Sequence, residues 1–537
     1  MSKTLMPSMH PLALQPKRIP LMLEVGRQLY RFPGGLRLRH HKQVACQDPL
    51  ARLPLPERLY LPLVQHQGPA GELQVAAGDR VRRGQPLTRA RNDCEVPIHA
   101  PAAGRIEAIR PWPVSWPPGT RADCLVLVSD ANGEAMPATT LPDWMDAAPE
   151  RIVEHLRDGG LAGLGGAMFP TAAKLRGDWA APEIHTLILN GSECEPYIAC
   201  DEMLMRNRPE AIVRGGMILA RALGAENIVI AIEDPMSAVR EALEAAAKTV
   251  DPSGHCLIAQ VSKIYPEGGE RQLIQVLTGA EVPHDGLPQD LGLACLNVGT
   301  AAAAHDIVIE GRPLSERIVT VSGPAIAKPR NVLAPLGAPI RELIAFAGGP
   351  IKAIDRLVLG GPMSGIPLAD DSIPIVKGSN CILALGADDT RREQPVMPCI
   401  NCGECVRVCP ASLLPQTLYQ AIRGEDHDQA RELNVFDCIE CGCCAHVCPS
   451  HIPLVDYYRH EKGVLRARGI EDARAEQARR RFEAREQRLA EREAERQRKR
   501  EQREQRLKAR EAAKSEVEAA VARARARSGA GDDGAAS

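Results

Sequence analysis

The N-terminal part of the chain has the pattern of β-structure. Between residues 35 and 130, short apolar runs alternate with glycine- and proline-containing turn signals, such as those at 68–69, 78–79 and 100–104. Short apolar runs bounded by turn residues are typical of β-strands. Further along, residues 186–190 form a continuous apolar run that ends in asparagine, which predicts a buried strand.

Two segments of the C-terminal part predict helices. Apolar side chains recur at helical spacing from Leu413 to Leu433. From Glu471 to Arg527 the composition reduces to Arg, Glu, Ala and Gln, with pairs such as Glu495 and Lys499 in the favourable order. We expect a solvated single helix there, with contact to anionic lipid or a partner as the alternative. Residues 528–537 have the composition of a disordered segment.

Composition indicates a multidomain globular protein. The chain has 537 residues, 44% apolar and 25% charged, which is enough for three or four domains. The formal net charge of 66 − 68 = −2 gives no reason to expect a nucleic-acid partner. The longest uncharged apolar stretch, Leu291 to Ala304, falls short of the ~20 residues of a membrane-spanning helix. The N-terminus lacks a signal-peptide pattern, so we expect a cytoplasmic protein that meets the membrane through a partner.

The cysteines indicate iron–sulfur chemistry. Eight of the seventeen are scattered without ligand spacing, which favours buried small side chains over a disulfide framework. The other nine lie between Cys399 and Cys448, where the pattern C-x2-C-x2-C-x3-C-P occurs twice. This is the two-cluster ferredoxin pattern, in which the fourth cysteine of each run binds the other cluster. Structural zinc is the alternative, and the duplicated pattern disfavours it.

The spacing predicts how these cysteines divide between two 4Fe-4S clusters. Cluster one is expected to be held by Cys399, Cys402, Cys405 and Cys448, and cluster two by Cys409, Cys438, Cys441 and Cys444. Cys443 falls outside the register. The helical spacing between the two motifs favours a helical dicluster domain over the compact ferredoxin sandwich. Two adjacent clusters form a one-electron relay.

A glycine-rich loop at residues 159–170, followed by a helix-like stretch with Lys174, is a candidate phosphate or nucleotide site. Glycines let backbone N–H groups approach an anion, and a following lysine supplies a positive charge. Neither a Walker loop nor the dinucleotide fingerprint is present. The predicted strand at 186–190 leads into the acidic segment 191–196, and ligands of α/β sheets gather where strands end.

This loop resembles the G-x-G-G-A-x-F-P-T-x-x-K segment of the flavoprotein subunit of respiratory complex I, and residues 190–196 resemble its N-A-D-E-G-E-P segment. The resemblance implies FMN and NADH as ligands. It implies that the flavin phosphate lies against the loop, the nicotinamide near its phenylalanine, and the flavin and nucleotide against the strand ends. The residues implied are Gly163, Gly165, Gly166 and Lys174 for the phosphate, Phe169 for the nicotinamide, and Asn190, Glu193 and Glu195, with a weaker match at Asn297 and Thr300. Ser192 stands where complex I has aspartate.

From about residue 30 to 460, the order of motifs is similar to that of the RnfC family of the Rnf complex, which is called Rsx in some bacteria. The motifs are Phe32-Pro33-Gly34-Gly35, Leu61 to His66, the glycine loop, Asn190 to Tyr197, Gly360 to Gly365 and the two four-cysteine motifs. The resemblance implies a peripheral subunit on the cytoplasmic side of the bacterial inner membrane. That subunit exchanges electrons with NAD(H) through FMN and with membrane-embedded and ferredoxin-like Rnf subunits through its clusters, coupled to ion movement.

The remaining segments resemble known modules. Residues 75–104 resemble the barrel-sandwich hybrid of biotinyl and lipoyl carriers, although residues 88–98 contain no lysine to modify, which favours a docking or capping role. Residues 318–350 resemble the β-grasp (SLBB-type) module that follows the flavin domain in complex I. The expected fold class is therefore multidomain α/β plus β. The expected parts are an N-terminal segment (1–34), a barrel-sandwich hybrid (35–130), an FMN/NADH α/β domain (135–312), a β-grasp module (313–375), a helical two-cluster ferredoxin domain (376–460) and a charged helical or disordered tail (461–537).

Two other functions fit part of this pattern. In one, the chain is a non-catalytic iron–sulfur adaptor of the same complex, an alternative that Ser192 keeps open. In the other, it is a soluble diaphorase subunit of a hydrogenase or dehydrogenase, which would share the glycine loop and the clusters. Flavin is required only if the chain exchanges electrons with NAD(H), because nicotinamide gives two electrons as hydride, whereas each cluster accepts one.

Overall fold

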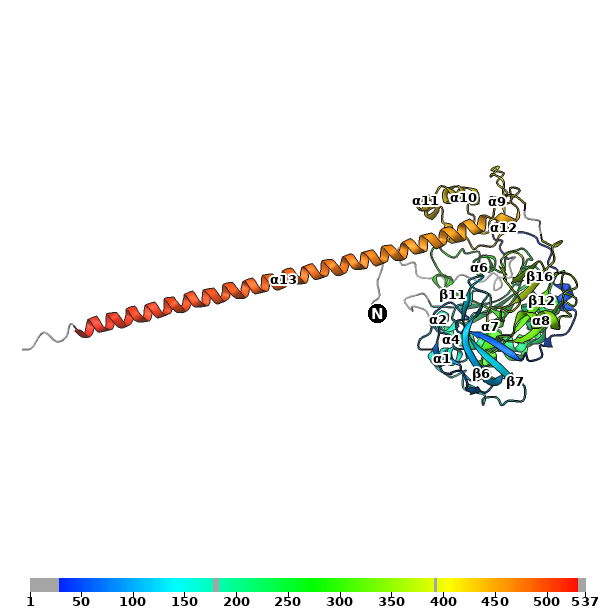
Figure 1. The fold of residues 1–537 in the computed structure, drawn as a ribbon, viewed down its shortest axis with the longest axis horizontal. Coiled ribbons are helices and arrows are strands. Elements are labelled where there is room, and N and C mark those ends of the chain that lie inside the picture. Colours follow the sequence, from blue (N-terminus) through cyan, green and yellow to red (C-terminus); the bar gives the residue numbers. More distant parts are fainter. Residues whose placement is uncertain (1–28, 177–182, 391–393, 530–537) are drawn as a thin grey trace, which may run out of the picture. The chain divides into compact units, whose positions relative to one another are not determined.

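The structure, a computed structural model, describes residues 29–176, 183–390 and 394–529. The chain forms two compact units, Met1–Arg459 and His460–Ser537. The first unit contains the sheets and the short helices of the cysteine region (Figure 1). Within the described ranges, no helix has both the length and the apolar character needed to span a membrane.

The β-rich N-terminal part contains an antiparallel sheet in the order β2-β7-β6-β4. Its core includes Leu59, Leu61, Ile106, Leu125 and Leu127, which are fully buried. The strands predicted from the turn signals are thereby confirmed. The elements are η2 Gln43–Cys46, β1 Ala51–Arg52, β2 Arg58–Pro62, β3 Glu72–Leu73, β4 Arg80–Val81, β5 Thr88–Arg89, β6 Ala103–Pro113 and β7 Arg121–Asp130.

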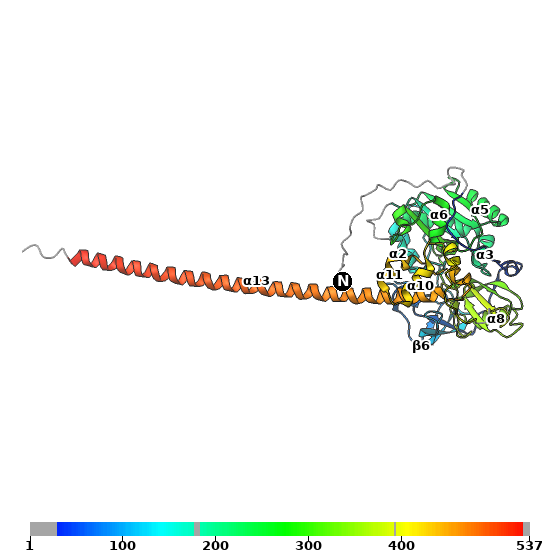
Figure 2. The ribbon, with the colours of Figure 1, turned by 90° about the horizontal axis from the view of Figure 1, so that it is seen from above.

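The central part is a parallel four-stranded sheet in the order β10-β9-β8-β11, with helices on both faces (Figures 1 and 2). Alternate residues of β8 face opposite cores: Leu187 and Leu189 pack with α1, α4 and α7, and Ile188 packs with α6. The buried strand expected at residues 186–190 is confirmed. The elements are α1 Pro149–Asp158, α2 Thr171–Arg176, β8 Thr186–Gly191, α3 Cys200–Asn207, α4 Pro209–Leu223, β9 Asn227–Glu233, α5 Ser237–Val250, β10 Cys256–Val261, α6 Glu270–Thr278, η3 Pro288–Leu291, β11 Leu293–Asn297 and α7 Val298–Val308.

A mixed six-stranded sheet in the order β1-β13-β12-β16-β14-β15 follows, with helix α8. β16 pairs with β12 and β14, although it lies beyond residue 375, the predicted end of the β-grasp module. A five-residue apolar strand has no local signal for the sheet it joins, because strand pairing is non-local. The elements are β12 Glu316–Ser322, β13 Arg330–Pro335, α8 Ile340–Phe346, β14 Arg356–Leu359, β15 Ile366–Pro367 and β16 Cys381–Leu385.

The cysteine region contains short helices, and the helical spacing at 413–433 resolves into α10 and α11. The tail helix is confirmed, and it starts earlier than the expected Glu471, at Leu454. Of the segment expected to be disordered, residues 530–537 lie outside the described part of the chain. The elements are α9 Glu404–Arg407, α10 Pro415–Arg423, α11 His427–Glu432, η4 Val435–Asp437, α12 Cys443–His446 and α13 Leu454–Gly529.

Candidate functional site

The parallel sheet has a topological switch point between β8 and β11. The chain proceeds from β8 to β9 and β10 on one side, and then returns to place β11 on the other side of β8. Ligands of open α/β sheets bind in the crevice at the carboxyl ends of the strands that flank such a point. Asn297, the last residue of β11, pairs in register with Asn190, the residue before the last of β8, and the Asn297 Nδ2 donates to the Asn190 carbonyl oxygen at 3.4 Å.

The glycine-rich loop lies directly beside this switch point. The backbone N–H of Leu164 donates to Thr300 Oγ1 at 3.0 Å, and a side chain at Gly165 would place its Cβ 3.3 Å from Asn297 Cβ. Gly166 has a φ of +99°, and the space where its side chain would point is open. The side chain of Phe169 is 44% exposed. The loop therefore leaves an open glycine-lined face and an accessible ring next to the strand ends.

Lys174 is held beside the end of β11. Its ammonium donates to the Cys295 carbonyl oxygen and to Glu270 Oε1, each at 2.7 Å. Both charged side chains are partly exposed, at 27% and 39%. The predicted phosphate-binding cation therefore has a competing carboxylate partner in this structure.

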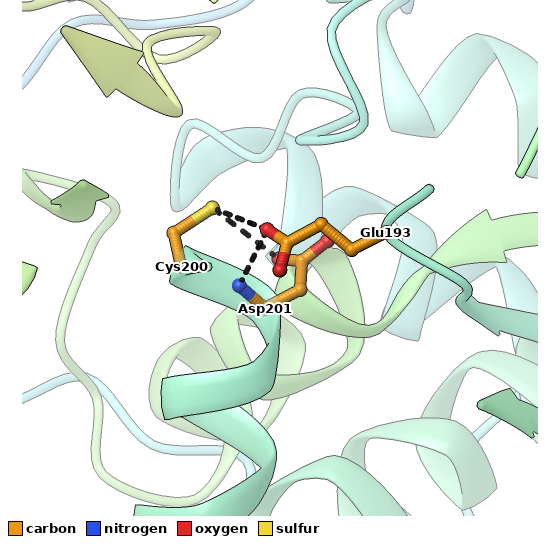
Figure 3. A group of neighbouring side chains, drawn as sticks. All are labelled: Glu193, Cys200 and Asp201. Carbon is orange, nitrogen blue, oxygen red and sulfur yellow. Dashed lines mark hydrogen bonds between the residues drawn. The ribbon is translucent and has the colours of Figure 1, made fainter. Parts of the chain in front are cut away.

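Glu193 lies in a buried polar cluster with Cys200 and Asp201 at the start of α3 (Figure 3). The Cys200 thiol donates to Glu193 Oε1 at 3.3 Å, and the Asp201 backbone N–H donates to the same oxygen at 3.1 Å. The Lys42 ammonium lies 3.6 Å from Glu193 Oε2 and 3.4 Å from Glu233 Oε2. Burial raises the pKa of Glu193 to about 7, against the opposing effect of Lys42.

Glu195 is committed to a neighbouring turn. Its carboxylate accepts hydrogen bonds from the backbone N–H groups of Met363 (2.6 Å) and Ser364 (3.0 Å) and from Ser364 Oγ (3.0 Å). Burial raises the pKa of Glu195. The turn at Gly360–Gly365 is thus held to the segment that follows β8. Ser192 is also buried, and its Oγ has no hydrogen-bond partner within the described structure.

Eight of the nine clustered cysteines line two small cavities, four in each. One cavity is lined by Cys399, Cys402, Cys405 and Cys448, together with Tyr419 and Ile452. The other is lined by Cys409, Cys438, Cys441 and Cys444, together with Leu413 and Tyr458. Cys443 instead packs with Cys194 and Tyr265 in an apolar cluster, against which Cys441 also packs. The structure therefore brings together the two sets of four that the spacing predicted.

The second of these cavities adjoins the α/β part. Tyr265 Oη donates to the Cys441 carbonyl oxygen at 2.7 Å, and the Gly35 backbone N–H donates to the Val408 carbonyl oxygen at 3.0 Å. Gly442 lies against Met363, the residue whose backbone binds Glu195. Around the first cavity, by contrast, Cys402 and Ile400 are exposed. The two cavities therefore differ in position: one faces the strand-end site and the other faces the surface.

Two further residues at this site, Lys42 and Tyr265, were not predicted from the sequence. Lys42 follows a run of arginines and histidines that has the composition of a solvated segment, and its carboxylate partner lies 151 positions away. Tyr265 belongs to a loop after β10 that carries no motif. Neither position gives a local signal, because both act through contacts between parts of the fold.

The donor sets fit the groups that the sequence predicts. Each cysteine cavity presents four thiols among mainly apolar side chains, and no carboxylate or histidine is among its described lining residues. Soft thiolate ligands of this number suit iron–sulfur clusters. At the switch point, the open space at Gly166 and the unpartnered buried Ser192 Oγ leave room and a polar contact for a bound cofactor.

Four segments of the chain match known protein families. They match, in chain order, the RnfC barrel sandwich hybrid domain (residues 30–132), the Nuo51 FMN-binding domain (156–306), the SLBB domain (318–367) and the 4Fe-4S dicluster domain (394–449). These matches confirm the predicted fold class and the two predicted types of cofactor domain.

Curated relatives extend the similarity over most of the chain. It is 44% identical over 461 residues to the C subunit of the ion-translocating oxidoreductase complex of Pseudomonas aeruginosa, covering 86% of this chain and 59% of that protein. The proteins of the same name from Edwardsiella ictaluri (44% over 476 residues; 87% and 58%) and Erwinia tasmaniensis (43% over 467 residues; 87% and 57%) are similarly close. The chain thus spans about six-tenths of the length of these relatives. Among solved structures, an NAD+-reducing nickel–iron hydrogenase aligns with a TM-score of 0.42 and 21% identity, over 60% of this chain and 64% of that chain.

Proposed function

Because the chain belongs to the RnfC family of ion-translocating oxidoreductase complexes, we propose that it is the NADH-linked electron-transfer subunit of such a complex. One observation carries this proposal: a nucleotide-type switch-point site and two four-cysteine cavities lie within one compact unit, and the second cavity contacts the switch-point site. An adaptor that only passes electrons between other proteins would not need the first of these features.

We propose that the glycine loop and the strand ends hold FMN and NAD(H). The Gly163, Gly165 and Gly166 backbone would admit the flavin phosphate, with Lys174 as its positive charge. The exposed ring of Phe169 offers a surface for the nicotinamide. Bound FMN would supply the conversion of a two-electron hydride into the single electrons that iron–sulfur clusters accept.

The strand-end side chains position the site rather than react. Asn297 caps α7 by accepting from the Gly299 backbone N–H at 2.8 Å, and it binds Asp201 through Nδ2 at 2.6 Å. Asn190 donates to the Gly268 carbonyl oxygen at 2.8 Å. Thr300 holds Leu164 of the glycine loop. Hydride transfer depends mainly on the distance and orientation of the two rings, so rigid positioning is the contribution expected of the protein.

The two cysteine sets are proposed as ligands of two 4Fe-4S clusters, with a defined order. Cluster two, at Cys409, Cys438, Cys441 and Cys444, would receive electrons first, because its cavity contacts Tyr265 and the turn that binds Glu195. Cluster one, at Cys399, Cys402, Cys405 and Cys448, would exchange electrons with partners, because Cys402 and Ile400 are exposed beside it.

The partners and location follow from the family. We propose that the chain works with other subunits of an Rnf (Rsx) complex, both membrane-embedded and ferredoxin-like, as a peripheral protein on the cytoplasmic side of the inner membrane. A soluble diaphorase is disfavoured by the match of residues 30–132 to the RnfC barrel domain.

Cofactor content tests the proposal. The chain purified without oxygen should hold about eight irons and, after incubation with FMN, about one flavin. Cys444→Ala should lower the iron content by about half, whereas Cys443→Ala, the neighbouring control, should leave it unchanged. Full iron content with no flavin binding under any condition would reject the NADH-linked function and favour the adaptor.

A further inference from the structure

The exposed helix α13 carries its basic residues on one face. At 100° per residue, twelve positions between residues 474 and 514 fall in one arc of about 80°. Eleven of these are basic and the twelfth is Ala478: Arg474, Arg481, Arg485, Arg488, Arg492, Arg496, Lys499, Arg503, Arg506, Arg510 and Lys514. We call these eleven residues the basic stripe. The rest of this segment contains only five basic residues, Arg479, Arg480, Arg498, Arg500 and Lys508.

The stripe is available to a ligand. All eleven side chains are exposed, and within the described helix Lys499 is the member that pairs with a carboxylate, Glu495, at 2.7 Å. Several of the other ion pairs of the helix involve Arg479, Arg480 and Lys508, which lie off the stripe. Between residues 474 and 514, no acidic residue falls in the arc. Of the nine glutamates in this segment, Glu495 lies about 20° beyond the edge of the arc and the other eight lie at least about 60° beyond it. These eight are Glu476, Glu483, Glu486, Glu491, Glu493, Glu501, Glu504 and Glu511.

The large apolar side chains of the helix lie on the same side. Phe482, Leu489 and Leu507 flank one edge of the arc, and Val517 and Val521 continue its line beyond Lys514. Their exposed fractions are 60%, 52%, 53%, 62% and 45%, respectively. A helix that is only solvated has no reason to gather both its apolar and its basic residues on one side and most of its acids away from them.

We propose that this face of α13 binds an anionic lipid surface. A straight stripe of about 60 Å, at 1.5 Å per residue, matches a plane. The phosphates of a nucleic-acid duplex instead wind around its axis and would meet only part of it. Arginine binds lipid phosphates through two N–H groups, and the flanking apolar side chains enter the headgroup boundary. The location at a membrane rests on the proposed function, whereas the one-sided distribution of charge does not.

Vesicle binding of the full chain tests the proposal. Co-sedimentation should be strong with vesicles that contain phosphatidylglycerol, weak with pure phosphatidylcholine, and weaker again as salt is added. Replacing Arg485, Arg492, Lys499 and Arg506 by Gln should weaken binding by about 100-fold or more, at about fivefold for each cation. The matched control replaces Arg479, Arg480, Arg498 and Lys508 by Gln, which removes the same charge away from the stripe. It should retain binding within about threefold.

A third variant separates lipid from other polyanions. Replacing Phe482, Leu489 and Leu507 by Ser should also weaken vesicle binding, since apolar insertion contributes only at a lipid surface. Equal losses in the stripe and control variants, or no vesicle binding, would overturn the proposal. Stripe-dependent binding to duplex DNA that is insensitive to the Ser variant would replace lipid by nucleic acid. Circular dichroism confirms that each variant stays helical, and NADH-dependent reduction of the clusters, measured in the same samples, reports separately on the proposed function.

Discussion

Lys42 and Glu193 show how a buried charge is placed at this site. The lysine ammonium donates to the Glu193 backbone carbonyl oxygen and lies near two carboxylates, those of Glu193 and Glu233. Removing one partner of a buried ion pair leaves an uncompensated charge, which is usually costly. The segment around residue 42 is therefore tied to the carboxyl edge of the parallel sheet by these charges, in addition to the stack of His41 on Tyr197.

At the residue scale, substitutions of Lys174 and of Glu270 are expected to change the affinity for FMN in opposite directions. If Lys174 binds the flavin phosphate, Lys174→Ala should weaken FMN binding about tenfold or more, because a hydrogen bond to a charged group is lost. Glu270→Gln should tighten binding by about two- to fivefold, because it releases Lys174 from a partly exposed ion pair. Flavin fluorescence quenching measures both constants.

A purely structural ion pair would behave differently. Both variants would then weaken FMN binding, or neither would change it. The exposed residue Glu281, replaced by Gln, serves as the control for loss of a carboxylate near the same helix.

At the element scale, the segment before η2 supports the cysteine region. Gly34 has a φ of +66°, and a Cβ there would lie 2.6 Å from the Val408 carbonyl carbon, in the run that contains Cys409. This close backbone approach explains why glycine occupies the position. No local pattern indicates this contact, because the two segments are far apart in the chain.

Gly34→Ala should therefore displace the backbone at Val408 and Cys409 and lower the iron content from about eight toward about four, through loss of cluster two. Gly119→Ala is the matched control, since Gly119 has a φ of +73° but open space around its Cβ position. Iron analysis and electron paramagnetic resonance measure the outcome. Equal iron in the two variants would show that the contact with Val408 does not support the cluster.

The cysteine sets could be predicted from sequence because their ligand spacing is a local property of the chain. The strand at 186–190 and the tail helix could be predicted for the same reason, since a continuous apolar run and charge pairs four residues apart are also local properties. The partners of Glu195 and Lys174 could not, because the turn at Gly360–Gly365 and Glu270 reach them only through the folded chain. Whether the glycine loop holds FMN remains a prediction that rests on its open face at Gly166 and on the family match.

At the scale of the whole first unit, Lys377 joins three parts of the fold. It is fully buried, and its ammonium donates to the carbonyl oxygens of Pro97 (2.6 Å) in the β-rich part and Gly160 (2.7 Å) at the start of the glycine loop. Its backbone N–H donates to Gln65 Oε1 at 3.2 Å. Burial lowers the pKa of Lys377 to about 7.

This pKa predicts a pH dependence of stability. Between about pH 7 and the ordinary lysine pKa, the unfolded chain binds a proton that the folded chain does not, so the free energy of unfolding rises with pH. From pH 7.5 to 9 the gain is about 2 kcal/mol, at 1.36 kcal/mol per pH unit. In Lys377→Met this rise in the free energy of unfolding should be absent, as measured by urea unfolding at both pH values. The control variant Lys328→Met, at an exposed position, should show the same rise as the unchanged protein. A rise that persists in Lys377→Met would show that another group causes it.

We propose that electrons enter the two clusters from NADH through FMN within this chain. This is tested by the absorbance of the clusters after NADH is mixed, without oxygen, with the full chain in its FMN-loaded and FMN-free forms. We expect rapid bleaching of both clusters in the FMN-loaded form, and none in the FMN-free form until FMN is added back. Bleaching at the same rate without FMN, or no bleaching with FMN bound, would contradict it.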